Sequence, residues 1–288
     1  MKEQKNALLL FSKPPVPGLV KTRLTIERGG RFTENEAADF FHRSLFDVAE
    51  NCCQALDVLE ARNAAEIEEN PTSAIRRSYD IFISTTPEDN VTKMRETFEA
   101  AGTWPREFHY LLDSGQTFDD HFDDAFQQIF DQGYETVVSV GGDIPTLPRN
   151  HLVQSFNWLH YFQTVYDTGG VVLAPCQECG TSLIGYTSDS GMNHQGVYYA
   201  NNGRPALDAY IEKASERGAH IAYLDAVPDV DDLQDLAHTI TLMKALEFCA
   251  QDQDLFVPYR TLEWVRFKGL RVTTPPNEDR DTREGLDY

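Results

Sequence analysis

Short apolar runs alternate with longer segments of helical periodicity along most of this 288-residue chain. The short runs are predicted to be strands, because they are too short for helices and are bounded by turn residues. The expected strands are 7–12, 80–85, 107–112, 135–140, 170–174, 181–186 and 219–224, and the expected helices are 33–56, 87–101, 117–130, 148–161, 205–217 and 232–250. Strands that alternate with helices indicate a mainly parallel sheet flanked by helices, so we expect an α/β fold.

The first apolar run leads into a stiff loop with three cations. Residues 8–11 are apolar, and three prolines follow within the next six positions. Gly18 comes next and allows a positive φ or a close approach to a ligand. Lys13, Lys21 and Arg23 should therefore gather at the carboxyl end of a strand, where open α/β sheets bind ligands. In a chain of net charge −21, this cationic loop (residues 12–23) indicates a ligand with several phosphates.

An ordinary exposed loop with solvated lysines is the alternative. Prolines on both sides of the charges argue against it, because they rigidify a segment that a solvated loop would leave free. The sequence has neither the Gly-x4-Gly-Lys-Ser/Thr loop of nucleoside triphosphatases nor the Gly-x-Gly-x-x-Gly dinucleotide turn. Cationic side chains, rather than a glycine-rich backbone, are thus expected to bind the phosphates.

The charge of the chain excludes some classes of partner. It has 46 Asp and Glu against 25 Lys and Arg, and no basic stripe offsets the repulsion from nucleic-acid phosphates. No apolar segment approaches the ~18 residues of a membrane span, and no signal peptide is evident. We therefore expect a cytoplasmic protein with no nucleic-acid partner and no membrane partner. Its stability should rise with salt, because screening relieves the repulsion among carboxylates.

The five cysteines do not form a secreted disulfide framework, because their number is odd and two are adjacent. Reduced thiols are expected. Cys176 and Cys179 form a lone Cys-x-x-Cys pair without the second ligand pair that zinc needs, and a redox role stays open.

A second informative motif places a carboxylate at the same edge of the sheet. The strand at 135–140 ends in two glycines, and Asp143 follows before a helix opens at Pro148. Asp143 could serve only as a turn or cap residue, which Asp does well. The alternative is a Mg²⁺ or Mn²⁺ ligand, since these ions are usually held by one or two carboxylates and substrate phosphates.

A third segment supports the metal site. Asp229 and Asp231 follow a predicted strand, and their alternation places both on one side of an extended chain. Asp232 is expected to cap the next helix, with Asp235 complementing its dipole. A solvated turn is the alternative in so acidic a protein. Together with Asp143 and the cationic loop, a site for a metal–phosphate complex is preferred.

Two motifs resemble a known family. They are F-x-K-x-P-x-P-G-x-V-K-T-R-L over residues 11–24 and G-D-x-P-x-L over residues 142–147. Together they resemble the selenodomain-associated transferases, a glycosyltransferase-A-like family related to the 2-phospho-lactate and molybdenum cofactor guanylyltransferases. The resemblance spans roughly residues 7–250 and implies a Rossmann-like nucleotide-diphospho-sugar transferase fold.

The resemblance also implies roles for the donor side of the site. Lys13, Lys21 and Arg23, in the loop that Gly18 shapes, would hold the nucleotide phosphates. Asp143 would hold Mg²⁺ or Mn²⁺ together with Asp231 and Asp229. Lys21 and Asp143 would carry the catalysis.

The acceptor would lie beside Glu178, Gly180, Thr181 and Ser182. Many relatives have Asp-Gly-Gly where this chain has Glu-Cys-Gly at 178–180. A cysteine restricts the backbone more than the glycine it replaces, so the usual acceptor is not expected.

The leading hypothesis is a divalent-metal-dependent nucleotidyltransferase that acts on a nucleoside triphosphate and a small phosphorylated or carboxylated acceptor. A glycosyltransferase that uses a nucleotide-sugar is the alternative, and a non-catalytic nucleotide-binding protein is a third. The expected organisation is a transferase domain over residues 1–250, followed by an appendage and polar tail over 251–288.

Overall fold

The computed structural model describes residues 2–177, 179–198 and 203–273. Within these ranges the strands form one seven-stranded sheet of order β3-β2-β1-β4-β6-β5-β7. The strands are β1 (Glu3–Phe11), β2 (Arg76–Thr85), β3 (Phe108–Leu112), β4 (Thr136–Val140), β5 (Gly170–Pro175), β6 (Thr181–Thr187) and β7 (His220–Tyr223). The helices are α1 (Glu34–Glu69), α2 (Glu88–Ala100), α3 (Phe118–Asp131), α4 (Arg149–Val165), α5 (Ala206–Arg217), α6 (Leu233–Cys249) and α7 (Tyr259–Phe267), with short 3₁₀ turns η1 (Thr22–Leu24) and η2 (Ile26–Arg28).

The sheet is mainly parallel, as the sequence predicts. β1 lies between β2 and β4 and is parallel to both. β6 alone runs the other way and pairs antiparallel with β4 and β5. The parallel strands β1, β2, β3 and β4 therefore end at one edge, and the loops that follow them meet there.

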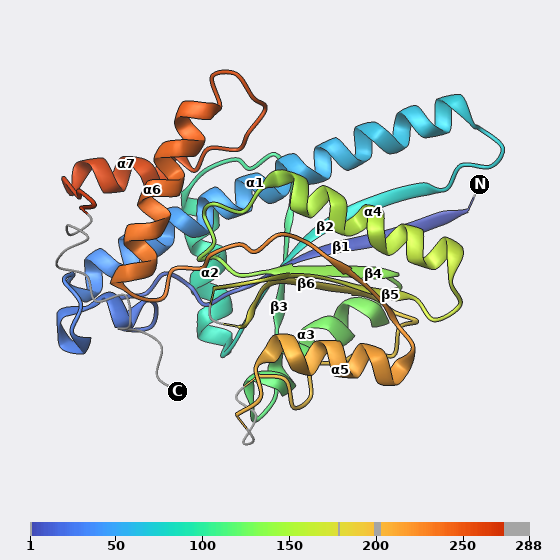
Figure 1. The fold of residues 1–288 in the computed structure, drawn as a ribbon, viewed down its shortest axis with the longest axis horizontal. Coiled ribbons are helices and arrows are strands. Elements are labelled where there is room, and N and C mark those ends of the chain that lie inside the picture. Colours follow the sequence, from blue (N-terminus) through green and yellow to red (C-terminus); the bar gives the residue numbers. More distant parts are fainter. Residues whose placement is uncertain (1, 178, 199–202, 274–288) are drawn as a thin grey trace, which may run out of the picture.

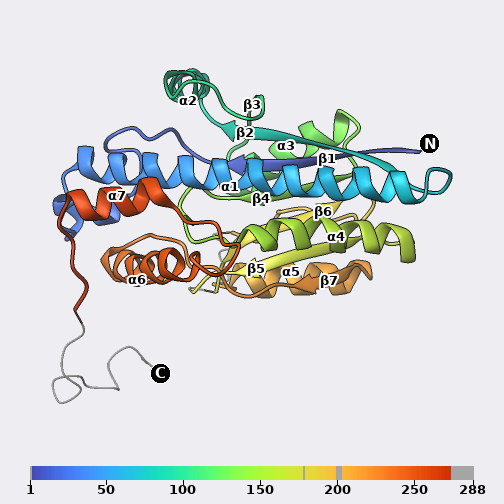
Figure 2. The same cartoon turned by 90° about the horizontal axis from the view of Figure 1, so that it is seen from above.

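Helices cover both faces of the sheet, which explains why the central strands are apolar along their whole length. Leu8 and Leu10 of β1 are fully buried on the face that α1, α2 and α4 cover. Ala7 and Leu9 are fully buried on the opposite face, against α3 and α5. Figure 1 shows the sheet between α1 and α4 on one side and α3 and α5 on the other, and Figure 2 looks down on α1 and α4 where they lie over the strands.

Helix α1 begins where its sequence signal predicts and ends later. Thr33 Oγ1 accepts a hydrogen bond from Glu36 N at 3.3 Å, and the Glu36 carboxylate accepts one from Thr33 N at 2.9 Å. This capping box confirms the predicted start. The predicted end at residue 56 is wrong, because α1 continues to Glu69. Residues 57–69 are mostly polar, so their hydrophobic periodicity fades while their Ala, Glu and Arg residues still favour a helix.

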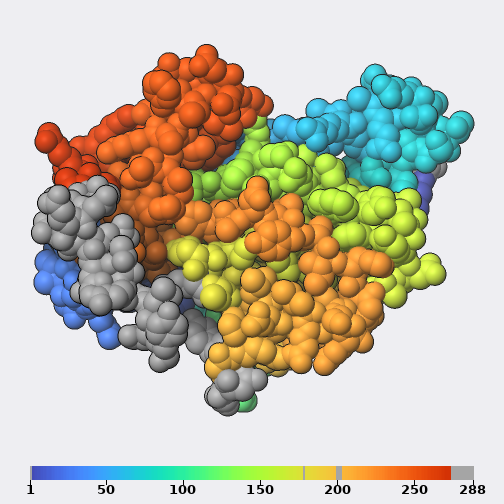
Figure 3. Space-filling view, viewed as in Figure 1, coloured from blue at the N-terminus to red at the C-terminus, as the bar shows by residue number. Residues whose placement is uncertain are grey.

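The C-terminal helices pack against the start of α1. Trp264 of α7 is fully buried, with its ring centroid 5.4 Å from that of Phe32 and 5.2 Å from that of Phe40. In the space-filling view α6 and α7 occupy one end of the molecule, and the cyan end of α1 occupies the other (Figure 3). The division at residue 250 stays a prediction. No helix in the described ranges is both long and apolar enough to cross a bilayer.

Candidate active site

The cationic loop connects β1 to α1 and has an unusual backbone. Gly18 has φ +76° and Lys21 has φ +47°, both in the left-handed region. A Cβ at Gly18 would also lie 3.1 Å from the Glu34 carboxylate. The left-handed backbone explains why a glycine stands at this position. The positive φ that the sequence allows at Gly18 is observed. Lys21 is not a glycine, so its left-handed backbone conformation is strained. This conformation fixes the direction in which the Lys21 side chain leaves the backbone.

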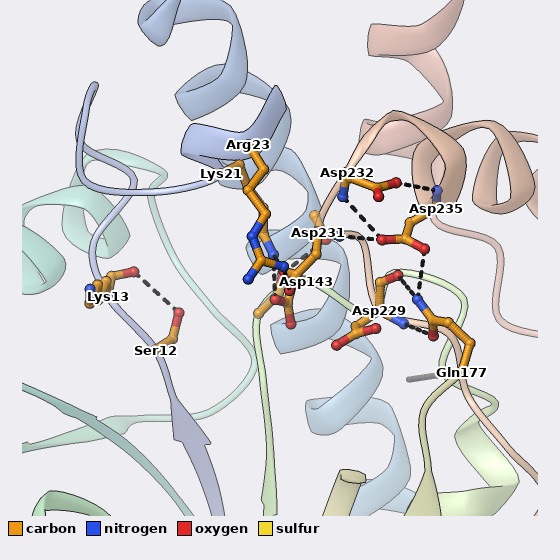
Figure 4. A network of polar contacts seen from close by, with 12 residues as sticks. Ser12, Lys13, Lys21, Arg23, Asp143, Gln177, Asp229, Asp231, Asp232 and Asp235 are labelled. Carbon is orange, nitrogen blue, oxygen red and sulfur yellow. Dashed lines mark hydrogen bonds and ion pairs between the residues drawn. The ribbon is translucent and has the colours of Figure 1, made fainter. Parts of the chain in front are cut away.

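The ammonium of Lys21 lies between two carboxylates. Its Nζ is 2.6 Å from Asp143 Oδ2 and 2.8 Å from Asp231 Oδ1. Asp143 follows β4 and Asp231 precedes α6, so three distant segments meet at this point (Figure 4). Arg23 Nη1 also pairs with Asp231, at 3.0 Å. The side chain of Lys21 is only 7% exposed, whereas that of Arg23 is 65% exposed. Lys21 is thus the buried cation of the site.

The charges of this cluster shift one another's pKa values. Burial alone would lower the pKa of Lys21, but Asp143 and Asp231 outweigh burial and raise it. Burial acts to raise the pKa of Asp231, and the nearby Lys21 and Arg23 reverse this and lower it. Burial and the charges of Asp143 and Asp231 raise the pKa of Asp229 to about 6. Three carboxylates are therefore crowded together around one cation, an arrangement suited to binding more positive charge.

Gln177 holds the segment that carries these aspartates. Its Nε2 donates to the carbonyl oxygen of Asp229 at 2.9 Å, and its Oε1 accepts from Asp229 N at 3.2 Å. The same Nε2 lies 2.9 Å from Asp235 Oδ1. Asp232 Oδ1 accepts from Asp235 N at 3.1 Å, which confirms the predicted helix cap. The carboxylates are thus held by a fixed backbone rather than by a solvated turn.

A cavity of about 320 Å³ opens beside Lys21 and Asp143. Lys13 of the cationic loop lines it, and Thr181, Ser182 and Tyr198 line it as well. We call it the central cavity. It is large enough to hold a small ligand at the carboxyl edge of the sheet.

Gly142, the second glycine after β4, is closely packed beside this cavity. A Cβ at Gly142 would lie 2.8 Å from Leu45 Cδ1, 3.0 Å from Ser12 Oγ and 3.2 Å from the Phe41 ring. Close packing, rather than a left-handed φ, therefore requires glycine before Asp143.

The predicted phosphate-binding residues do not all converge. Lys21 and Arg23 lie together at Asp231, but Lys13 lies apart from them and is exposed (Figure 4). The backbone oxygen of Lys13 accepts from Ser12 Oγ at 3.1 Å. Lys13 shares the central cavity with Lys21, while Arg23 does not line it. Their roles toward a nucleotide stay predictions.

The predicted acceptor residues follow β5 and enter β6. Glu178 lies outside the described residues. The oxygen of Gly180 accepts from Cys176 N at 3.1 Å, and Ser182 Oγ donates to the carbonyl of Val227 at 2.6 Å. Cys179 has φ +61°, a conformation that glycine adopts more easily, so this loop keeps a glycine-like backbone with a side chain added.

A chain of hydrogen-bonded side chains leads from Thr181 and Tyr198, which line the central cavity, into the buried interior. Thr181 Oγ1 lies 2.9 Å from Tyr198 Oη, and Tyr210 Oη donates to Tyr198 Oη at 3.2 Å. Tyr210 Oη in turn lies 2.5 Å from Nδ1 of the buried His194. Sequence reasoning missed Tyr198, because no local pattern marks it.

Sequence reasoning also missed a second cavity of about 320 Å³, which we call the side cavity. Phe11, Ser12, Lys13 and Phe118 line both cavities, so the two adjoin. Asp113, which directly follows β3, lines the side cavity too. A strand followed by Asp is the same signal that singled out Asp143, and it could have identified Asp113.

Asp113 is buried, and each of its two carboxylate oxygens lies close to a polar side chain. Its Oδ2 accepts from Ser84 Oγ at 2.7 Å. Its Oδ1 lies 2.8 Å from His121 Nδ1 without the alignment of a hydrogen bond. Oγ1 of buried Thr85, in the same cavity, has no hydrogen-bond partner within the described ranges. Because buried polar atoms are rarely left without partners, these atoms suggest a ligand that supplies them.

No group of three His, Cys, Asp or Glu residues in the described part of the chain is already arranged to hold a metal ion. Around Lys21, the cation between the carboxylates is an ammonium. Asp143 and Asp231 nonetheless offer the hard oxygen donors that Mg²⁺ and Mn²⁺ prefer.

A family described as an uncharacterized protein conserved in bacteria (DUF2064) matches residues 72–200. This is less than half of the chain, and it includes Asp143 but not the cationic loop, Asp229 or Asp231. No curated protein matches the chain. The resemblance to the selenodomain-associated transferases stays a prediction.

Two solved structures resemble this chain to different degrees. A protein from Desulfovibrio desulfuricans G20, provisionally described as a nucleotide-diphospho-sugar transferase, has a TM-score of 0.65 and 22% identity over 92% of this chain and 95% of its own. A cytidylyltransferase from Leptospira borgpetersenii serovar Hardjo-bovis has a TM-score of 0.45 and 13% identity over the same shares, 92% and 95%. The first of these likenesses confirms the predicted fold class: this chain has the nucleotide-diphospho-sugar transferase fold.

Proposed function

We propose that this protein is a divalent-metal-dependent nucleotidyltransferase. One observation carries the proposal: a buried lysine and two carboxylates from three distant segments meet at the mouth of a cavity, at the ligand-binding edge of an α/β sheet. Opposite charges placed together in this way suit a complex of a metal ion with a polyphosphate, because each half of the complex finds its counter-charge.

The carboxylate oxygens of this cluster are the type of donor that a divalent metal ion prefers. Asp143 and Asp231 already share one cation, the Lys21 ammonium, and Asp229 adds a third carboxylate nearby. Mg²⁺ or Mn²⁺ bound by these aspartates would stabilise negative charge on the phosphates. Lys21, Lys13 and Arg23 would add positive charge around the leaving group.

The proposed reaction needs no nucleophile from the protein. An oxygen of the phosphorylated or carboxylated acceptor forms a bond to the α-phosphorus of a nucleoside triphosphate. The bond from that phosphorus to the bridging oxygen breaks, and pyrophosphate leaves with the electron pair. The attacking oxygen is already ionised near neutral pH, so the site has only to position the reactants and neutralise charge.

The side cavity suits the nucleotide base. Its aromatic walls, Phe11 and Phe118, can contact a flat ring, and the carboxylate of Asp113, which lines the same space, offers an acceptor for a ring N–H. Lys13 lines both cavities, so phosphates attached to a ring held there would extend toward Lys21.

The acceptor is proposed to lie in the central cavity beside Thr181 and Tyr198, which line that space and share a hydrogen bond. Gly180, Ser182 and Glu178 would shape this end of the site.

Glycosyl transfer from a nucleotide-sugar is the second candidate. The neighbour from Desulfovibrio is described as a nucleotide-diphospho-sugar transferase, and the same metal and cations could hold a diphosphate. Pyrophosphate release tests the first proposal against this second one. It is measured for the four nucleoside triphosphates, each with phosphorylated and carboxylated acceptors, with Mg²⁺ or Mn²⁺ at low and high KCl.

Turnover of UDP- or GDP-sugars with inert triphosphates would replace the first proposal by the second. Nucleotide binding that does not depend on metal, without turnover of either donor, would indicate a non-catalytic nucleotide-binding protein.

A further inference from the structure

The position of Lys21 has a consequence for how a metal ion could bind, and this inference rests on the metal site of the proposed function. Mg²⁺ binds carboxylate oxygens at about 2.0–2.1 Å. In the structure, Asp143 Oδ2 and Asp231 Oδ1 already contact Lys21 Nζ at 2.6 and 2.8 Å. A metal ion bound to the same two oxygens and the ammonium would repel each other strongly at such a short separation, so the two cations compete for this position.

We propose that Lys21 is a built-in counter-cation that occupies the metal position in the nucleotide-free protein and is displaced when the metal binds. The ammonium neutralises carboxylates that would otherwise repel one another without compensation. Its pairing with two aspartates also explains how a lysine side chain that is only 7% exposed keeps its charge. Metal-free protein is stabilised in this way, at the expense of metal affinity.

The displaced ammonium has a place to go. Lys21 lines the central cavity, and its Nζ lies 5.9 Å from the centroid of the Phe41 ring, which lines the same cavity. Four rotatable side-chain bonds let the ammonium turn toward the cavity while the backbone stays fixed at φ +47°. There it would meet phosphates, so metal and polyphosphate should favour each other's binding.

The test is Mn²⁺ binding by the full chain without nucleotide, followed by electron paramagnetic resonance. Lys21→Met keeps the length of the side chain and removes its charge. We expect it to tighten Mn²⁺ binding by about tenfold or more, because the competing cation is gone. Lys13→Met removes the same charge from the same loop, away from the aspartates, and should change the affinity by less than about twofold. Equal affinities in wild type and Lys21→Met, or equal tightening in Lys13→Met, would overturn the proposal.

Measurement of the melting temperature keeps the test decisive if Lys21→Met folds poorly. Without metal, Lys21→Met should melt below wild type, since its aspartates are left without a counter-charge. Mn²⁺ should raise its Tm by more than it raises that of wild type. Lys21→Gln, whose amide still donates to the carboxylates, is the second variant and should behave in the same direction. A larger Mn²⁺ effect on wild type than on both variants contradicts the inference.

Wild-type protein provides a further readout. An amine-directed reagent, followed by mass spectrometry, should label Lys21 faster with saturating Mg²⁺ than without it, while labelling of exposed Lys93 on α2 stays unchanged. Unchanged labelling of Lys21 would count against displacement. None of these measurements uses a nucleotide, so the inference can stand where nucleotidyl transfer fails, and the reverse.

Discussion

Lys21 Nζ lies 2.6 Å from Asp143 Oδ2, although 122 positions separate the two residues in the chain. The contact forms because β1 and β4 are parallel neighbours, so the loops that follow them leave the same edge of the sheet. The proline-containing segment after β1 then brings Lys21 back over the end of β4. The topology thus joins a cation and a carboxylate from two separate motifs into one site.

The side cavity gives a prediction about nucleotide affinity. Asp113→Asn keeps the size of the side chain but replaces a carboxylate by an amide, so the acceptor for a ring N–H is weakened. We expect KM for the nucleotide to rise about tenfold, with kcat changed much less, because the contact is remote from the reacting phosphates.

Thr85→Val removes another polar atom of this cavity, one that has no hydrogen-bond partner among the described residues, and should act in the same direction. Thr92→Val, at an exposed position of α2, is the matched control. The assignment of the side cavity to the base is lost if Asp113→Asn lowers kcat alone.

The next prediction concerns Asp47, whose hydrogen bonds anchor α7 to α1. It is fully buried in α1 and accepts from Thr261 N at 2.8 Å and from Thr261 Oγ1 at 2.7 Å, while Arg260 Nη1 lies 3.2 Å from Oδ1. Asp47→Asn turns an amide group toward these donors. We expect the free energy of unfolding in urea to fall by about 2–4 kcal/mol.

Asp39→Asn is the control for Asp47. It breaks a half-exposed pair with Arg43 and should cost less than about 0.5 kcal/mol. Similar losses in the two variants would show that Asp47 is no special anchor.

Another prediction is that the buried His160 makes the free energy of unfolding sensitive to acid between pH 6.5 and 3. Burial lowers its pKa from 6.5 to about 3, and its Nε2 lies 2.8 Å from Asn6 Oδ1. The unfolded chain therefore binds a proton at this residue below pH 6.5, whereas the folded protein does so only near pH 3. The neutral form contributes stability that is fully present above pH 6.5 and is lost as pH falls toward 3, with a slope of up to about 1.4 kcal/mol per pH unit.

The measurement is the free energy of unfolding as a function of pH in wild type and His160→Gln. The variant should lose less stability than wild type between pH 6.5 and 3. His238→Gln, at an exposed position of α6, should follow wild type. Parallel curves for His160→Gln and wild type would rule out this origin of the acid sensitivity.

Local signals in the sequence were sufficient for most of the fold. All seven strands lie where apolar runs predict them, and the Thr33 and Asp232 caps start helices as expected, because these features depend on a few neighbouring residues. Residues 57–69, about the last third of α1, were missed because the hydrophobic periodicity of the helix weakens there. The antiparallel direction of β6 has no local signal, because it follows from how β5 and β6 connect.

The candidate site could be predicted only in part. From the positions of the strand ends, Lys21, Asp143 and Asp231 are predicted to lie at one edge of the sheet. Their contacts in the structure agree with this prediction. That the ammonium would lie between the carboxylates depends on side-chain geometry across three segments. The position of Tyr198 beside the central cavity could not be predicted from the sequence for the same reason.

The central claim is tested most directly by the metal dependence of turnover at Asp143. With the best pair of nucleoside triphosphate and acceptor, wild-type protein and Asp143→Asn are compared for pyrophosphate release over a Mn²⁺ titration, with Asp39→Asn as control. We predict that wild type and Asp39→Asn require Mn²⁺ or Mg²⁺ and that Asp143→Asn is slower by about 100-fold or more. Undiminished release by Asp143→Asn, or equal release by wild type in EDTA, would contradict a metal–nucleotide site at Lys21, Asp143 and Asp231.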